Sequence, residues 1–272
     1  MNHTTTRFLS FAAFLFLCVA TTARADVKAQ ILDLSNNQKI AADIRWMPVD
    51  KQYVVTVRGQ GGQISERTCS ADDIRILQVQ TPQNWEQILK TLKSNPTSAI
   101  PALKKIANDY KMLMWDTRAG KLIGEIYLKQ GQAEKALAEM APIMQANPTA
   151  GWNSPMAPVL WKAMIDSKKT RQLGRLLEQA AGATDRSLAA QAMIYRGDMI
   201  ESEGRTRDAL RDGYLRAVFL FADQTALQPE ALFKAAQAFD KLRQTAYAER
   251  MRGQLRKNYG SSTWAKKLDG GN

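Results

Sequence analysis

The chain has 272 residues, of which 38 are lysine or arginine and 26 are aspartate or glutamate, so its formal net charge is +12. Its one histidine, His3, and one of its two cysteines, Cys18, lie in the first 25 residues, which leaves Cys69 as the only thiol beyond them. Histidine-based triads, histidine-ligated zinc sites and cysteine–histidine dyads all need side chains that this remainder lacks. We therefore expect no metal, no cofactor and no enzymatic activity.

The first 25 residues have the pattern of an export signal. Arg7 precedes an apolar run over residues 8–20, and Ala23-Arg24-Ala25 supplies the small residues that a signal peptidase recognises. The run is too short to span a bilayer. We expect cleavage before Asp26 and a soluble periplasmic or secreted protein with a charge of +10, because the signal carries two arginines and no acid. A short membrane anchor, or a lipid on Cys18, is the alternative.

Residues 26–81 have the pattern of short strands. Residues 27–34 alternate between apolar and polar side chains, and residues 53–57 are β-branched or aromatic. Turn-forming residues lie between the runs, as at Ser35-Asn36-Asn37 and around Gly59. This pattern predicts a small all-β module, either a meander or an SH3-like barrel.

The composition becomes helical after Pro82, where alanine, leucine, lysine and glutamine replace the β-branched clusters. Asn95-Pro96 interrupts the helical pattern, because proline cannot continue a preceding helix. We expect a helical hairpin over residues 82–116.

A motif of small and large apolar residues begins near residue 117. Gly124 is followed by Tyr127, Ala136 comes nine residues after Tyr127, Met140 four residues later and Pro148 eight after that. These spacings resemble the tetratricopeptide repeat (TPR), in which two antiparallel helices pack closely and stack on the next pair. The resemblance implies that Gly124 and Ala136 lie where the helix backbones approach, and that Tyr127 and Met140 fill the space between hairpins. One departure is Gly120, which stands where the motif has tryptophan.

The spacing recurs later in the chain, in copies that begin 37, 36 and 39 residues apart. The segment 154–187 is the poorest match. The resemblance implies a mainly α fold, a TPR-like α-solenoid of helical hairpins over residues 117–267, closed by a C-terminal capping helix that starts near Trp264. An unrelated bundle of α-hairpins is the alternative. The later packing positions are Gly197, Ala209, Ala236, Phe239 and Ala248.

In this family the first helix of each pair lines an inner surface, on the face opposite the packing positions. Carried over by position, that face predicts a partner-binding groove. Its expected members are Arg118, Lys121, Glu125, Leu128, Lys129, Lys162, Ile165, Gln191, Ile194, Asp198 and Glu201.

These features favour an exported scaffold for protein–protein interaction in the cell envelope, with another envelope protein or peptide as its partner. The alternative is a basic module that binds peptidoglycan or anionic lipid, since excess positive charge attracts anionic partners. A third hypothesis is a hydrolase using carboxylates such as Asp72-Asp73 or Glu201 and Glu203. Nucleic acid is not expected as a partner, because an exported protein seldom meets it.

Overall fold

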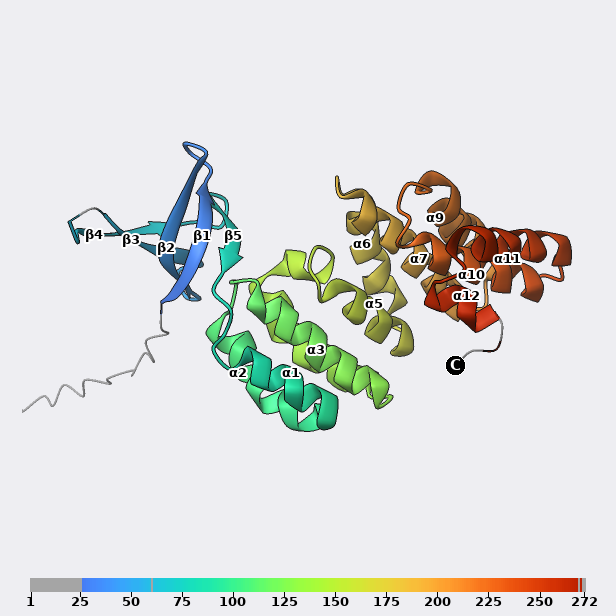
Figure 1. Ribbon diagram of the computed structural model, residues 1–272, viewed down its shortest axis with the longest axis horizontal. Coiled ribbons are helices and arrows are strands. Elements are labelled where there is room, and N and C mark those ends of the chain that lie inside the picture. The colour runs from blue at the N-terminus through green and yellow to red at the C-terminus, as the bar shows by residue number, and fades with distance from the viewer. Residues whose placement is uncertain (1–25, 60, 269, 271–272) are drawn as a thin grey trace, which may run out of the picture.

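The structure is a computed structural model that describes residues 26–59, 61–268 and 270. The predicted signal peptide, residues 1–25, lies outside the described residues. Figure 1 shows a small sheet at one end of an elongated arrangement of helices, with the last helices at the other end.

Five antiparallel strands form the sheet, in the order β4-β3-β2-β1-β5. The first four strands follow one another as a meander, and β5 returns beside β1. The all-β start that the alternating pattern predicted is therefore confirmed. The strands are β1 (Val27–Asp33), β2 (Gln38–Met47), β3 (Gln52–Arg58), β4 (Ile64–Cys69) and β5 (Ile74–Val79).

The sheet curves, so that strands separated in its order come into contact. Arg67 on β4 donates a hydrogen bond of 2.6 Å to the carboxylate of Asp33 on β1, although β3 and β2 lie between these strands. Asp33 is 3% exposed. Hydrogen bonds from Ser35 and from Arg67 hold the pKa of its carboxyl at about 2, because they stabilise the charged form. This ion pair links the edge strand β4 to β1 across the curved sheet.

The rest of the chain is mainly helical, as predicted. None of the described helices is long and apolar enough to cross a membrane. The helices are α1 (Trp85–Ser94), α2 (Ile100–Asp109), α3 (Trp115–Lys129), α4 (Ala133–Ala146), α5 (Ala157–Asp166), α6 (Thr170–Ala181), α7 (Arg186–Ser202), α8 (Thr206–Ala209), α9 (Leu215–Leu220), α10 (Gln228–Lys241), α11 (Thr245–Tyr259) and α12 (Thr263–Leu268), with short 3₁₀ turns η1 (Pro96–Ala99) and η2 (Pro148–Gly151) and a π-helical turn η3 (Leu210–Tyr214).

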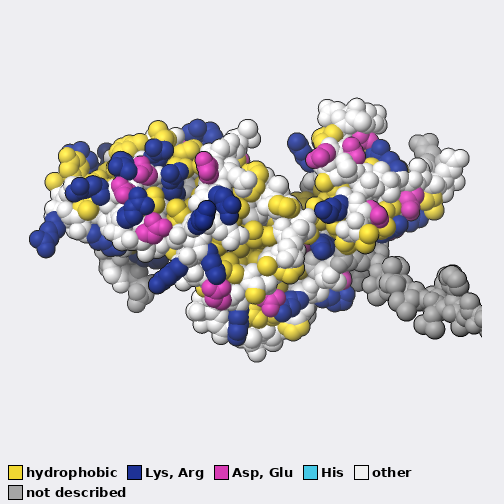
Figure 2. Space-filling model, turned by 180° about the vertical axis from the view of Figure 1, so that it is seen from behind, with side chains coloured by type: hydrophobic (Ala, Val, Ile, Leu, Met, Phe, Trp, Pro, Cys, Tyr) yellow, Lys and Arg dark blue, Asp and Glu magenta, His cyan; other side chains and the backbone are white. Residues whose placement is uncertain are grey.

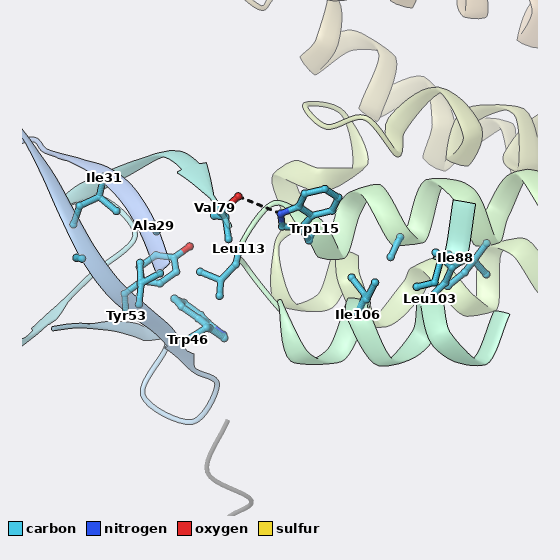
Figure 3. Close-up of a cluster of buried hydrophobic side chains, with 14 of the residues drawn as sticks. Ala29, Ile31, Trp46, Tyr53, Val79, Ile88, Leu103, Ile106, Leu113 and Trp115 are labelled. Atoms are coloured by element: carbon cyan, nitrogen blue, oxygen red, sulfur yellow. Dashed lines mark hydrogen bonds between the residues drawn. The ribbon is translucent and has the colours of Figure 1, made fainter. Parts of the chain in front are cut away.

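The sheet and the first helices share one apolar core (Figure 3). Tyr53 on β3 donates a hydrogen bond of 2.9 Å to the carbonyl of Met112, just before α3. The indole of Trp115, at the start of α3, donates one of 3.5 Å to the carbonyl of Val79 at the end of β5. Leu113 lies between these two contacts and is 1% exposed. The sheet is therefore packed on the helices.

Four turns between consecutive helices have the same geometry. Gly131, Lys168, Gly204 and Arg243 adopt positive φ, at 71°, 56°, 76° and 59°, and their spacings are 37, 36 and 39 residues. After each, the next amide donates to a carbonyl five residues back, as from Gln132 to Tyr127 and from Gln244 to Phe239. This bond and the left-handed residue form the Schellman ending of a helix. The repeat spacing seen in the sequence is thus a spacing of identical helix endings.

Several expected packing positions are buried between the helices of these pairs. Ala136, Met140, Ala209 and Ala248 are fully buried, Ala236 is 1% exposed, Phe239 is 7% exposed, and Tyr127 is half-buried between two apolar clusters. Pro148, the last position of the motif, was also expected to pack between the helices, and this prediction is wrong: Pro148 is exposed at the start of η2, where it stops α4 from continuing.

The glycines mark where helices approach most closely. A Cβ on Gly124 would lie 2.7 Å from Val159 of α5 and 3.1 Å from Met140 of α4. A Cβ on Gly213, in η3, would lie 2.4 Å from the backbone of Gly197 in α7. These positions tolerate no side chain without movement of their neighbours.

Candidate functional site

The expected groove residues lie on corresponding positions of α3, α5 and α7. Asp198 stands six residues before the turn residue Gly204, and Glu125 and Lys162 stand six residues before Gly131 and Lys168. The exposed fractions of these side chains differ, however, and several of the side chains are not free to contact a partner.

On α3 and α5 most of these side chains contact their own helix or the core. Arg118 is exposed and its guanidinium lies 4.5 Å from the centre of the Trp115 ring, while Lys129 is also exposed. Ion pairs one helical turn apart join Lys121 to Glu125 and Lys162 to Asp166. Leu128 and Ile165 are half-buried against the same apolar cluster.

The prediction for Ile194 is wrong. Its side chain is 1% exposed and packs in the apolar cluster between α7, η3 and α10. Gln191, one turn earlier on α7, is half-buried. The middle of α7 is thus enclosed by its neighbours, and Ile194 cannot contact a partner.

Asp198 and Glu201 do come together, in a pocket of about 320 Å³ between α7, η3 and α10. The other half of this pocket was not predicted from the sequence, because no groove residue was expected on α10. Gln237 stands six residues before Arg243, the position of Asp198 in its own repeat, so carrying the α7 register forward would have found it. The other lining residues are Ser202, Tyr214, Lys234, Ala238 and Lys241.

Lys234 forms the buried centre of the site. Its side chain is 17% exposed, and its ammonium lies 2.5 Å from the carboxylate of Asp198 and 2.9 Å from that of Glu230. Burial by itself would lower the pKa of Lys234, but the two carboxylates outweigh it and raise that pKa above its usual value. Lys234 is therefore held as a cation, and it is not a candidate nucleophile.

Two tyrosines complete the surroundings of this lysine. The hydroxyl of Tyr214, at the end of η3, donates a hydrogen bond of 3.0 Å to Asp198. Burial, followed by the charge of Asp198, raises the pKa of Tyr214 well above its usual value. The ring of Tyr195 lies 5.8 Å from the Lys234 ammonium. Both oxygens of Asp198 thus have donors, one from Tyr214 and one from Lys234.

Glu201 is less completely paired. One of its oxygens accepts hydrogen bonds from Lys241, at 2.6 Å, and from Thr206, at 3.1 Å. The other, Oε2, is buried and accepts no hydrogen bond from the described residues. A buried oxygen without a donor is costly, because it has lost its water and gained nothing in return. Glu201 therefore has an unused capacity to accept a hydrogen bond.

The charges in this site are unbalanced in the direction opposite to that of the whole chain. Three carboxylates, of Asp198, Glu201 and Glu230, meet two ammonium groups, of Lys234 and Lys241, which leaves one negative charge in excess. The chain itself carries a formal charge of +12. The residues that line the pocket itself carry two charges of each sign, and the excess comes from Glu230, which pairs with Lys234 outside the lining.

The other acidic candidates from the sequence have structural partners. Glu203 is exposed and pairs with Arg205, so it does not share a site with Glu201. Asp73 accepts a hydrogen bond of 2.7 Å from the amide of Ser70 in the turn before β5, while Asp72 is exposed. Among the described residues, no group of three or more acidic or cysteine side chains is arranged to hold a metal ion.

The surface outside the pocket is rich in basic side chains. Figure 2 shows lysine and arginine over the helices and the sheet alike on the face that it presents. They are densest in sequence on α11 and α12, whose single acid is Glu249. The bases there are Arg250, Arg252, Arg256, Lys257, Lys266 and Lys267.

Comparison with known proteins does not assign the chain to a family. No protein-family model matches it, and no curated protein matches it. The site must therefore be interpreted from its own geometry.

Proposed function

We propose that this chain is an exported TPR-like scaffold that binds a segment of another envelope protein on the surface formed by the first helices of its repeats. The observation that carries the proposal is the pocket between α7 and α10, where charged side chains from two successive repeats converge. Four identical helix endings at near-regular spacing support the solenoid arrangement. Binding, rather than catalysis, is the activity we propose.

Export is part of the same proposal. It rests on the signal pattern over residues 1–25, and a periplasmic or secreted location follows from it. In that compartment the partner would be an envelope protein or peptide, and nucleic acid would not be a partner.

The proposal is tested by photo-crosslinking in the native envelope. A crosslinking residue placed at Gln237, on the pocket wall, should capture one defined protein, whereas the same residue at Lys257, on α11, should capture little. The captured protein should then bind the purified chain directly. Equal and unselective capture from both positions would contradict the proposal.

A charge test complements the crosslinking. Reversing Arg118, Lys121 and Lys129 to glutamate should weaken binding of the captured partner, because complementary charges along the inner surface steer association. The matched control reverses Arg250, Lys257 and Lys266, three exposed cations on α11 and α12. Arg252 is left out of this control because it pairs with Asp240 and Glu249 and its side chain is only 22% exposed.

A second function is favoured by one observation, the exposed bases on α11 and α12, among them Arg250, Lys257 and Lys266. It is binding to an anionic envelope polymer such as peptidoglycan, or to anionic lipid. In that case the control variant should lose more binding than the α3 variant, and the loss should disappear as salt is raised, because exposed charges are screened.

A further inference from the structure

We infer that the pocket between α7 and α10 takes a primary ammonium group of the bound partner, which Glu201 holds. The inference rests on the proposed function and specifies the chemistry of that site. Among the described residues, Glu201 Oε2 is a buried acceptor with no donor. The cluster of Asp198, Glu201, Glu230, Lys234 and Lys241 around it carries one excess negative charge. A ligand ammonium in the place of Lys241 keeps the charge of this cluster unchanged and brings N–H donors that can reach both oxygens of Glu201.

Each of the two lysines in the pocket plays a different part. Lys234 is 17% exposed and its ammonium is held by two carboxylates, so it is a fixed component of the wall. The side chain of Lys241 is 60% exposed and its ammonium contacts Glu201 alone. Exposed ion pairs contribute little to stability, so Lys241 can leave at small cost. Its ammonium marks where the ammonium of a ligand would bind.

The burial of Oε2 makes this exchange a requirement of binding. The atom has no exposed surface, so a ligand reaches it only when the Lys241 side chain swings away or Glu201 turns toward the pocket. Gln237, exposed on the rim, and Ser202 can then contact the ligand beside its ammonium group. Lys241 therefore competes with the ligand for the same carboxylate.

The alternative ligand is an anion, which would bind to the ammonium of Lys241. The two possibilities predict opposite effects of removing that side chain. If a ligand ammonium displaces Lys241, Lys241→Met should tighten binding; if an anion contacts Lys241, the same substitution should weaken binding. Lys241 lies on the surface at the end of α10, so the substitution should leave the fold intact.

The probe is pentalysine that is acetylated at its amino terminus and amidated at its carboxyl terminus, titrated against the purified protein by calorimetry. A basic protein repels this peptide in general, so saturable binding reports a local acidic site. Pentaalanine with a free amino terminus tests whether the ammonium can come from a chain end. Capped pentaglutamate tests the anion.

We expect three results from the variants. Glu201→Gln should weaken pentalysine binding about tenfold or more, because a charged hydrogen bond is lost. Lys241→Met should tighten pentalysine binding about threefold or more, because Lys241 no longer competes with the peptide for Glu201. Glu203→Gln, on the same end of α7 but paired with Arg205 outside the pocket, should change it less than about twofold.

Weaker binding to Lys241→Met, or saturable binding of pentaglutamate in place of pentalysine, overturns the inference. So does an equal loss with Glu201→Gln and Glu203→Gln, which would indicate diffuse charge. Binding of pentaalanine as well as pentalysine supports it and extends the source to amino termini. If crosslinking captures no partner but the peptide results hold, the ammonium site stands and the scaffold proposal fails. If crosslinking captures a partner but the peptide results fail, the scaffold proposal stands and the ammonium site is rejected.

Discussion

Single glycines set the closest approach between the helices. Gly197 and Gly213 meet backbone to backbone, and the ring of Tyr214 covers Gly197. Gly197 could be identified from the sequence because it repeats the position of Gly124. The role of Gly213 could not be identified in this way, because Gly213 stands where other copies have the large residues Met140 and Leu177. The π-helical turn η3 explains why a glycine replaces a large residue here. That turn also directs the Tyr214 hydroxyl to Asp198.

This contact predicts a large difference between two glycine substitutions. Gly213→Ala places a Cβ 2.4 Å from the Gly197 backbone, and overpacking of this kind costs about 1–3 kcal/mol or more. Gly253→Ala is the matched control, because Gly253 is exposed in α11 and its Cβ would meet nothing within 4 Å. Alanine there should stabilise the helix by about 0.5–1 kcal/mol. Urea unfolding of both variants checks this, and equal midpoints would contradict the contact.

The error at Ile194 has a physical reason at the same scale. Ile194 stands ten residues before its turn residue, as Lys121 does, so position in the repeat suggested a shared face. A helix in the middle of the stack is covered on more sides than a pattern of two faces implies. Ile194 is an apolar residue at a position predicted to be exposed, and this was the signal in the sequence that its side chain would be buried.

At the scale of elements, the strands and helices were predictable and their docking was not. Alternating side chains predicted the sheet, and the composition after Pro82 predicted the helices. Nothing local in the sequence indicated that Tyr53 would donate to Met112, 59 positions away, or that Trp115 would donate to Val79. Such contacts depend on how two finished elements fit, which periodicity does not report.

The docking contact can be tested through its hydrogen bond. Tyr53→Phe removes the donor to the Met112 carbonyl and keeps the ring, so it should lower the free energy of unfolding by about 1 kcal/mol. Tyr247→Phe is the control, because that ring is 52% exposed on α11.

The same experiment shows whether the sheet and helices unfold together. Hydrogen exchange during unfolding, followed separately in peptides from the sheet and in peptides from the helices, should give coincident transitions, since one core spans both parts. Separate transitions, with Tyr53→Phe shifting only that of the sheet, would mean that the sheet folds independently of the helices.

At the scale of the whole molecule, other elements cover both ends of the series of helices. At the first end, the sheet and α1–α3 share a core. At the last, Trp264 of α12 lies against Phe233 of α10, with ring centres 5.2 Å apart, and Ala265 is 3% exposed. The repeat array that we propose needs such covers, because each terminal pair would otherwise expose the face that inner pairs bury.

The cover at the last end predicts a coupled change in stability and self-association. Trp264→Ala should lower the free energy of unfolding by about 1–3 kcal/mol, below the range for a fully buried tryptophan because Trp264 is only half-buried. It should also uncover part of the apolar face of α10 and α11, and exposed apolar patches promote association. Lys266→Ala, on the exposed side of α12, is the control. Thermal unfolding and sedimentation at several protein concentrations measure both effects. A destabilised variant that stays dispersed at every concentration would show that α12 stabilises the fold without shielding its end, whereas an unchanged melting temperature would show that it covers nothing.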